Sequence, residues 1–314
     1  LGPTMKSVGE VMAIGRKFEE VIQKSIRMLD IGKDGLVLNR QNGESFDDEQ
    51  IEERLQTTDD NILYYVVAAL HKGVSIEKIY QLSAIDPWFL KKINNIVEVE
   101  RRLKSSTLDH KLLSDAKKFG FSDNQIGRAV KKEGLEIRKI RKDLGIIPAV
   151  KQIDTLAAEW PAETNYLYLT YGGTENDISI TKNDSGVIVL GAGPYRIGSS
   201  VEFDWGTVNM VWGLQDGGQK NVVVVNCNPE TVSTDYDICN RLYFEELTLE
   251  RILDISEFER PNGIVTSVGG QTANNLTPKL ADSGITLIGT NAEDVDRAEN
   301  RSKFSQVLDR LHIG

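Results

Sequence analysis

The chain has 314 residues, of which 40% are hydrophobic and 27% are charged, and its formal net charge is −10. This composition excludes membrane-embedded and disordered classes of protein. Because domains usually hold ~100–200 residues, the length predicts about two domains, each able to bury a core without disulfide or metal support.

The charge is divided unevenly between the two halves. Residues 1–154 carry 26 Lys and Arg against 24 Asp and Glu, a net charge of +2, whereas the rest carries 11 against 23, a net charge of −12. Binding to nucleic-acid phosphates depends on clustered Lys and Arg. The acidic second half is therefore a poor general surface for nucleic acid.

The cysteines and the two ends of the chain indicate the cellular compartment and whether the chain is complete. Cys227 and Cys239 lie twelve residues apart without a Cys-x-x-Cys spacing, so neither a disulfide framework nor a zinc ribbon is predicted. No apolar run reaches the ~18 residues of a membrane span, and residues 1–5 lack the pattern of a secretory signal. We therefore expect a cytoplasmic protein. The start on Leu-Gly-Pro and the end at Gly314, inside a helical pattern, predict a segment of a longer chain.

Residues 44–147 show the punctuation of a series of short helices. Asp86 precedes Pro87 as a capping carboxylate, and Ser122 with Gln125 forms a capping-box pattern. Glycines stand where preceding helices should end. An all-α region is predicted, with these C-terminal caps: Gly73, Gly120 and Gly145.

After residue 148 the pattern changes. Residues 148–185 predict a connection with one extended stretch at 166–171, and from residue 186 short apolar runs alternate with helical stretches. Strands buried on both faces and linked by helices predict a doubly wound, mostly parallel α/β sheet. The expected strands are 187–190, 222–225, 263–266 and 286–288, and the expected helices are near 200–216, 248–258 and 272–283.

A glycine-rich turn, with Gly191, Gly193 and Gly198, follows the first of these strands. Such a turn before a helix suits an anion or nucleotide, but a tight turn without ligand explains the glycines equally well. The spacing G-x-G-x-x-x-x-G is a poor dinucleotide fingerprint, and of the residues after the second strand only Glu230 could replace the expected acid.

Polar loops are expected to meet at the carboxyl edge of the sheet. Arg196 and Glu202 flank the first loop, and residues 226–235 and 269–271 form two more. Ligand sites of α/β proteins lie at this edge, so three converging loops predict a site, although Arg196 and Glu202 alone could be a surface ion pair. No catalytic triad, metal-ligand cluster or Walker loop is apparent; the histidines are scattered at His71, His110 and His312.

Residues 122–130 and 134–144 have the pattern of a helix-turn-helix. The second helix carries four basic residues, so DNA binding is considered. The alternative function is a freestanding helical assembly or DNA-binding module fused to a nucleotide-binding Rossmann-like domain. Acidic residues interrupt this basic stripe, as on an ordinary solvated helix face. The basic residues are Arg138, Lys139, Arg141 and Lys142, and the acidic ones are Glu133, Glu136 and Asp143.

Four long motifs resemble the large chain of the carbamoyl-phosphate synthetase family, in the correct order and essentially end to end. They are residues 5–16, 194–204, 226–237 and 296–301. The family's large chain has two synthetase halves, each a Rossmann-like pre-ATP-grasp domain followed by an ATP-grasp domain, with a helical oligomerisation domain between them. The resemblance thus implies an all-α oligomerisation domain followed by an α/β Rossmann-like domain with a mostly parallel sheet.

The resemblance also implies a domain assignment. Residues 1–30 correspond to the tail of the first ATP-grasp domain, 31–179 to the helical oligomerisation domain and linker, 180–296 to the pre-ATP-grasp domain of the second half, and 297–314 to the start of the second ATP-grasp domain.

The implied activity is an ATP-dependent ligation. The family makes carbamoyl phosphate, for pyrimidine and arginine biosynthesis, from bicarbonate, glutamine-derived ammonia and two ATP with Mg²⁺ or Mn²⁺. Its partner is a glutamine amidotransferase small subunit or a fused glutaminase domain, and the helical domain should self-associate; neither nucleic acid nor membrane is expected as a partner. The carboxylates that hold the metal would lie outside this chain, so we expect it to be inactive alone, without a tightly bound cofactor.

Particular residues take roles from the resemblance. Met5, Arg196, Ser200 and Glu202 resemble lining residues of the tunnel that carries carbamate between the halves, and Arg301 resembles an arginine that contacts an ATP phosphate. No catalytic residue and no metal ligand is assigned within the chain. The sequence departs from many bacterial relatives at Tyr195, Ser199-Ser200 and Gly206-Thr207. The resemblance therefore does not predict the width of the tunnel.

Overall fold

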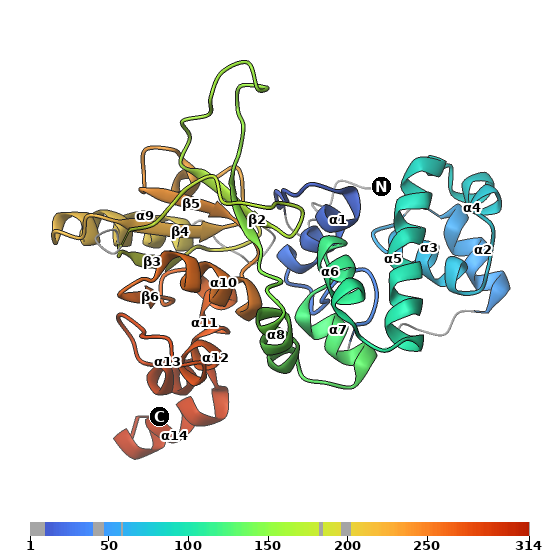
Figure 1. Ribbon diagram of the computed structural model, residues 1–314. Coiled ribbons are helices and arrows are strands. Elements are labelled where there is room, and N and C mark those ends of the chain that lie inside the picture. Colours follow the sequence, from blue (N-terminus) through green and yellow to red (C-terminus); the bar gives the residue numbers. More distant parts are fainter. Residues whose placement is uncertain (1–9, 40–46, 58, 182–184, 196–201, 314) are drawn as a thin grey trace, which may run out of the picture. The chain divides into compact units, whose positions relative to one another are not determined.

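The computed structural model describes residues 10–39, 47–57, 59–181, 185–195 and 202–313 (Figure 1). The chain forms two compact units. A helical unit comprises residues 15–149 and 170–174, and an α/β unit comprises residues 1–14, 150–169 and 175–314, each within its described part. The α/β unit therefore takes residues from both sides of the helical stretch.

The helical unit is built from short helices whose ends follow the sequence signals. Asp86 Oδ1 accepts the backbone N–H of Trp88 at 2.7 Å, and Ser122 and Gln125 form the expected capping box. The three predicted C-terminal glycines, Gly73, Gly120 and Gly145, have φ of +82°, +81° and +72°. The helices are α1 (Phe18–Met28), α2 (Asp48–Gln56), α3 (Ile62–His71), α4 (Ile76–Ser83), α5 (Pro87–Ser105), α6 (His110–Lys118), α7 (Asp123–Val130) and α8 (Gly134–Asp143).

Helix α5 is the centre of this unit. It contacts α1, α3, α4, α6 and α7, and its buried side chains Ile93, Ile96 and Val97 join the hydrophobic core (Figure 1). Burial of this apolar face supplies most of the stabilisation of short helices, which are marginal in isolation.

A buried ionic cluster accompanies that apolar core. Asp123 accepts from Lys117 Nζ at 2.9 Å and from Arg141 Nε at 2.9 Å, and all three side chains are almost inaccessible to solvent. The ring of Tyr171 lies 5.0 Å from Lys117 Nζ and 5.6 Å from the guanidinium carbon of Arg141. The cluster ties α6, α7 and α8 to residues 170–174.

The α/β unit contains a sheet with the strand order β1–β2–β5–β4–β3–β6 within the described residues. The strands are β1 (Ala149–Gln152), β2 (Tyr166–Thr170), β3 (Val187–Leu190), β4 (Val222–Asn226), β5 (Arg241–Phe244) and β6 (Gly263–Val265). Strands β2, β5, β4, β3 and β6 run parallel to their neighbours, with Ile188 opposite Val223 on one side and Ile264 on the other. The predicted mostly parallel sheet is confirmed.

Helices cover both faces of this sheet (Figure 1). Alternate residues of β3 belong to different cores: Ile188 packs with residues of α10–α12, and Val189 packs with residues of α9. This arrangement is doubly wound, as predicted. The helices are α9 (Glu202–Asp216), the 3₁₀ turn η2 (Val232–Thr234), α10 (Leu249–Glu259), α11 (Gly270–Asn274), α12 (Thr277–Asp282), α13 (Ala292–Glu299) and α14 (Arg301–Leu311).

Two predicted elements need correction. The strand expected at 286–288 is a single parallel bridge between Leu287 and Ile264. The helix expected at 272–283 is divided into α11 and α12, because Pro278 lacks an N–H and its ring would clash with the carbonyl of Asn274 in a continuous helix.

Strand β5 was not predicted, because it contains an arginine and a tyrosine among its four residues. Arg241 binds Glu259 through Nε and Nη2, at 3.0 and 2.7 Å, and the Tyr243 hydroxyl donates to the same carboxylate at 2.6 Å. Polar residues therefore occupy a central strand where a partner on α10 satisfies them.

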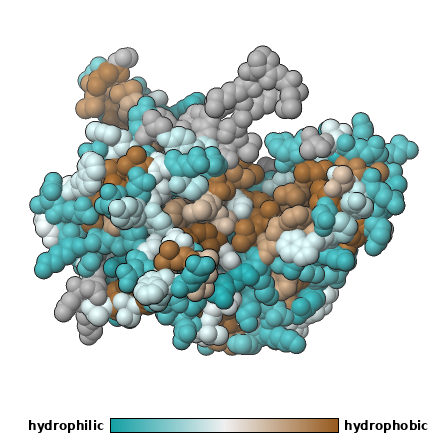
Figure 2. Space-filling view, turned by 90° about the horizontal axis from the view of Figure 1, so that it is seen from above, coloured by the Kyte–Doolittle hydropathy of each residue, from teal (hydrophilic) through white to brown (hydrophobic). Residues whose placement is uncertain are grey.

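The surface mixes hydrophilic and hydrophobic residues. Figure 2 shows teal side chains over most of the face drawn, with separate brown patches between them. Within the part of the chain that the structure describes, no helix is long and apolar enough to cross a membrane.

Candidate functional site

The carboxyl edge of the sheet carries the predicted polar loops, and hydrogen bonds join two of them. Parallel strands β3 and β4 end at the same edge, followed by residues 191–195 and 227–234. The backbone N–H of Gly193 in the first loop donates to Oδ1 of Asn226, the last residue of β4, at 3.2 Å. The convergence of these loops is confirmed.

Asn226 is the hydrogen-bonding centre of this edge. Its side chain is fully buried, and Oδ1 accepts from the backbone N–H of Gly193, of Cys227 at 2.8 Å and of Asn228 at 3.3 Å. Its Nδ2 donates to the Ser233 hydroxyl at 3.2 Å. A single amide thus satisfies backbone groups on two loops that would otherwise be buried without partners.

Asp204 connects the second loop to helix α9. Its carboxylate accepts the backbone N–H of Ser233 at 3.2 and 3.3 Å, and its side chain is only 5% exposed. A carboxylate in the first turn of a helix is also favoured by the helix dipole. The start of α9, and with it Glu202, is therefore held to the loop after β4.

Close packing and backbone conformation account for Gly191 and Gly193 of the first turn, whereas Gly198 lies outside the described residues. A Cβ at Gly191 would lie 2.7 Å from Asn226 Nδ2, and Gly193 has φ +74°. The first position needs glycine for space and the second for its backbone conformation. Packing and backbone conformation thus explain these two glycines without a bound dinucleotide. This agrees with the poor match to the dinucleotide-binding fingerprint.

The third loop packs against the first. A Cβ at Gly269 would lie 2.4 Å from the carbonyl oxygen of Gly191, so the two backbones are in direct contact. Gly270, at the start of α11, has φ +66° and faces the ring of Phe203. The first loop therefore contacts both the end of β4 and the third loop.

An N-terminal segment also reaches this edge. The N–H of Glu10 donates to the carbonyl oxygen of Tyr195 at 3.0 Å, and that of Met12 donates to the carbonyl oxygen of Cys227 at 2.8 Å. Met12 and Ile14 pack against the core on the α9 face of the sheet. Residues far apart in the sequence therefore meet at the loops after β3 and β4.

The structure places two of the predicted site residues. Glu202 is the first residue of α9 and Arg301 is the first residue of α14, and both are exposed. Met5, Arg196 and Ser200 lie outside the described residues. Glu230, suggested as a possible ribose-binding acid, is exposed, and its N–H donates to Asn228 Oδ1 at 3.0 Å.

Sequence reasoning missed the inner residues of this edge. Asn226 was included only as part of a polar loop, and Asp204 only as part of a motif. The available signal for Asn226 was its position at the end of an otherwise all-valine buried strand, where an amide needs several partners.

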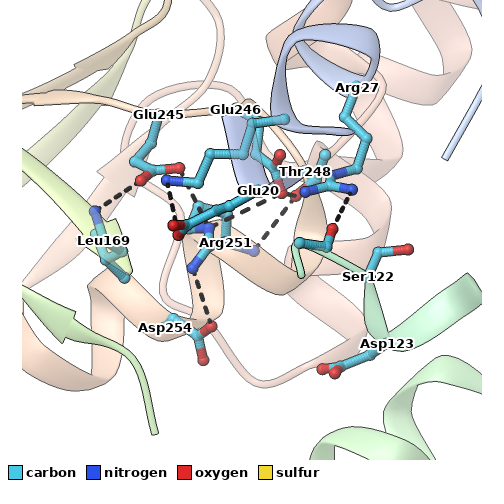
Figure 3. Close-up of polar contacts among 12 residues, drawn as sticks. Glu20, Arg27, Ser122, Asp123, Leu169, Glu245, Glu246, Thr248, Arg251 and Asp254 are labelled. Carbon is cyan, nitrogen blue, oxygen red and sulfur yellow. Dashed lines mark hydrogen bonds and ion pairs between the residues drawn. The ribbon is translucent and has the colours of Figure 1, made fainter. Parts of the chain in front are cut away.

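A second polar cluster lies where β5 ends. Figure 3 shows Arg251 of α10 between acidic side chains: its Nε lies 3.3 Å from Glu245 and 3.8 Å from Glu246, and its Nη1 lies 3.8 Å from Asp254. Glu245 also accepts the N–H of Leu169 at 2.6 Å. These side chains are buried, and the cluster ties β2, β5 and α10 together.

Cys239 and Tyr243 are two buried titratable groups beside the sheet core that are not activated as nucleophiles. Burial raises the pKa of the Cys239 thiol to about 12. Burial and the neighbouring Glu259 carboxylate raise the pKa of Tyr243 well above its ordinary value. Both groups stay protonated near neutral pH, which suits hydrogen bonding and packing. Among the described residues, no group of three or more His, Cys, Asp or Glu side chains is placed to hold a metal ion.

The structure leaves only half of the basic stripe behind the DNA-binding alternative exposed, at Lys139 and Lys142. Helices α7 and α8 are present as predicted, but Arg138 and Arg141 of the basic stripe are 6% and 0% exposed. Arg141 is committed to Asp123 inside the unit. Two of the four basic side chains therefore do not face a phosphate backbone.

Comparison with known proteins identifies the class of both units. Residues 10–145 match the family model of the carbamoyl-phosphate synthetase large chain oligomerisation domain, and residues 183–297 match that of the carbamoyl phosphate synthase preATP-grasp domain. A helical assembly domain thus precedes a preATP-grasp α/β domain.

Relatives that align with the whole of this chain identify its family. The whole chain aligns at 48% identity with the carbamoyl phosphate synthase large chain of Hyperthermus butylicus, with the multifunctional protein CAD of Squalus acanthias and with the mitochondrial carbamoyl-phosphate synthase [ammonia] of Aquarana catesbeiana. The chain belongs to the carbamoyl-phosphate synthetase large-chain family. It spans 30%, 14% and 21% of the length of these three relatives.

Proposed function

We propose that this chain is the part of a carbamoyl-phosphate synthetase large chain that joins its two synthetase halves. The complete enzyme would be an ATP-dependent ligase that makes carbamoyl phosphate from bicarbonate, glutamine-derived ammonia and two ATP. The order of the two matching domain models, and the names of relatives that align over the whole chain, support this assignment.

The proposed domain limits are residues 1–30 for the tail of the first ATP-grasp domain, 31–179 for the oligomerisation domain and linker, 180–296 for the preATP-grasp domain and 297–314 for the start of the second ATP-grasp domain. The matched ranges 10–145 and 183–297 support a helical region followed by a preATP-grasp region. Helix α1, within the proposed tail, belongs to the compact helical unit.

The carboxyl edge of the sheet would form part of the tunnel wall for carbamate, with Met5, Arg196, Ser200 and Glu202 as lining residues. The observation that carries this proposal is the pairing of residues 10–12 with the loops after β3 and β4. The pairing brings the segment that follows Met5 to Tyr195, the residue before Arg196, and to Cys227 in the loop after β4. Carbamate decomposes in water, so a passage lined by fixed polar groups would protect it.

The ATP and Mg²⁺ or Mn²⁺ of the complete enzyme would be bound mainly by residues outside this chain. Arg301 fits a phosphate contact, because it is exposed at the first position of α14 and its planar guanidinium can donate two parallel hydrogen bonds. A bound metal ion would supply positive charge that offsets the charge of the ATP phosphates. We therefore expect the isolated chain neither to hydrolyse ATP nor to form carbamoyl phosphate.

The partners proposed are a glutaminase, as a separate subunit or fused domain, and further copies of the same chain. The helical unit matches a model described as an oligomerisation domain, which supports self-association. Sedimentation velocity of this chain over a concentration range should show a reversible increase in mass. A monomer at every concentration would contradict self-association through this unit. We place the complete protein in the cytoplasm, although relatives include enzymes described as mitochondrial.

The tunnel assignment is tested with Glu202→Ala in the full-length enzyme. Carbamate would escape and decompose, so more ATP should be consumed for each carbamoyl phosphate formed. The matched control is Glu293→Ala, since Glu293 is likewise an exposed acid in the first turn of a helix, and its side chain is 83% exposed. Normal coupling of ATP use to product in the Glu202 variant would overturn the tunnel assignment.

A further inference from the structure

We infer that Asn226 is a positioning residue for carbamate transfer. It would act by holding the loop after β3, the loop after β4 and the start of α9 in one fixed arrangement. This inference rests on the proposed function, because it assigns the residue that keeps the proposed tunnel wall in shape.

The first step of the argument is the concentration of hydrogen bonds on one amide. Oδ1 of Asn226 accepts three backbone N–H groups, from Gly193 at 3.2 Å, Cys227 at 2.8 Å and Asn228 at 3.3 Å. These groups belong to two separate loops. Because Asn226 is fully buried, water does not replace the amide without rearrangement of the loops.

The second step is a continuous path from Asn226 to Glu202. Asn226 Nδ2 donates to the Ser233 hydroxyl at 3.2 Å, and the Ser233 N–H donates to Asp204 at 3.2 and 3.3 Å. Asp204 is in the first turn of α9, two residues after Glu202. Through these hydrogen bonds the Asn226 amide would fix the position of the first turn of α9, and with it Glu202. It would do so without contacting the carbamate itself.

The third step is the tightness of the site. The Asn226 side chain lies against the α-carbon of Gly191, where a Cβ would come within 2.9 Å of three of its atoms. The packing leaves one position for the amide, so its hydrogen bonds define the spacing between the loops. A shift of about 1 Å in such groups is enough to impair a positioned reaction.

The experiment compares Asn226→Ala and Asn226→Asp in the full-length enzyme. Alanine removes the acceptor and the donor, whereas aspartate keeps the acceptor oxygen at the cost of a buried charge. We expect the ATP consumed per carbamoyl phosphate to rise at least about twofold in Asn226→Ala and less in Asn226→Asp. A role confined to fold stability would not give this order, because a buried charge destabilises at least as much as the lost amide.

Two further variants keep the test interpretable. Ser233→Ala removes only the hydroxyl that accepts from Asn226 Nδ2. It should raise the ATP consumed per carbamoyl phosphate, but less than Asn226→Ala does. Tyr243→Phe removes a buried hydrogen bond from β5, the strand beside β4, to Glu259 of α10, leaves the hydrogen bonds of the Asn226 side chain in place, and should leave coupling unchanged. Hydrogen exchange of the full-length enzyme should show faster exchange of Gly193, Cys227 and Asn228 in Asn226→Ala.

The outcomes separate the inference from the function on which it rests. If Glu202→Ala uncouples the enzyme while a folded Asn226→Ala retains normal coupling, the positioning role is wrong and the tunnel stands. If neither variant uncouples, the proposed tunnel fails. Unchanged exchange of the three amides would also overturn the positioning role. If Tyr243→Phe uncoupled the enzyme as much as Asn226→Ala, the effect would come from general destabilisation and the positioning role would be wrong.

Discussion

Asp204 receives the backbone N–H of Ser233 at both carboxylate oxygens, at 3.2 and 3.3 Å, and so joins the first turn of α9 to the loop after β4. The two residues are 29 positions apart in the sequence. Their contact fixes where a helix starts relative to a loop, which helix propensity alone does not determine. The consequence is a carboxyl edge whose loops depend on one another.

Replacement of Asp204 by alanine should lower the free energy of unfolding of the α/β unit by about 1–3 kcal/mol, because the buried Ser233 N–H loses its acceptor. Urea denaturation followed by circular dichroism measures the change. The matched control is Asp216→Ala at the other end of α9, where the carboxylate is exposed and opposes the helix dipole. A loss no larger than in this control would show that the contact does not stabilise the unit.

Replacement of Asp123 by alanine should destabilise the helical unit by about 3–5 kcal/mol, because Lys117 and Arg141 would remain as buried cations without their carboxylate. Chemical denaturation checks this value. Asp115→Ala is the control, since Asp115 pairs with Arg102 at the surface and should matter by less than about 1 kcal/mol. Equal effects of the two substitutions would contradict a specific role for the buried cluster.

Glu100 should make stability depend on pH. Burial acts to raise the pKa of its carboxyl, but hydrogen bonds and charge from His71 and Lys104, each at 2.7 Å, outweigh burial and lower that pKa below its ordinary 4.5. The folded-state pKa is thus below the unfolded one. This stabilisation is complete above the unfolded pKa and is lost as pH falls through the folded pKa.

The measurement for Glu100 is urea unfolding of the native chain and of Glu100→Gln from neutral pH to below 4. The difference in unfolding free energy should be largest near neutral pH and should shrink as acid protonates Glu100. Glu98→Gln, at an exposed ion pair with Arg101, is the control and should show little pH dependence. A difference for Glu100 that grows in acid would have the wrong sign for this account.

The thiol of Cys239 should resist alkylation in the folded protein, because its pKa of about 12 keeps the nucleophilic thiolate scarce and its side chain is buried. A Cys227→Ser variant isolates this thiol for labelling with iodoacetamide at pH 8. We expect slow modification under native conditions and rapid modification in denaturant. Equal rates would mean that the site opens readily.

The sequence-based prediction succeeded where local chemistry decides structure. Asp86 and Ser122 begin helices because their side chains satisfy nearby N–H groups, and the valine runs at 187–190 and 222–225 form central strands. Both kinds of signal lie within a few residues of the element that they define. The fold class and the edge of the sheet where the polar loops lie followed from them.

Long-range partners decided the elements and site residues that were missed. Strand β5 is stable because Glu259, from a later helix, binds Arg241 and Tyr243. Asn226 gains its importance from Gly193, 33 residues earlier, and Asp204 from Ser233. A local pattern does not specify such distant pairings, so the loops were predicted as a group but their internal organisation was not.

The strands and loops of the α/β unit come from both sides of the helical unit, and residues 170–174 return to the helical unit before the chain continues. The chain thus passes between the two units four times, at 14/15, 149/150, 169/170 and 174/175. No single cut in the polypeptide separates them. A truncation that begins at residue 150 would leave the carbonyl oxygens of Tyr195 and Cys227 without their donors at residues 10 and 12. Expression of the α/β unit by itself therefore requires its N-terminal segment to be joined to residues that follow the whole of 15–149.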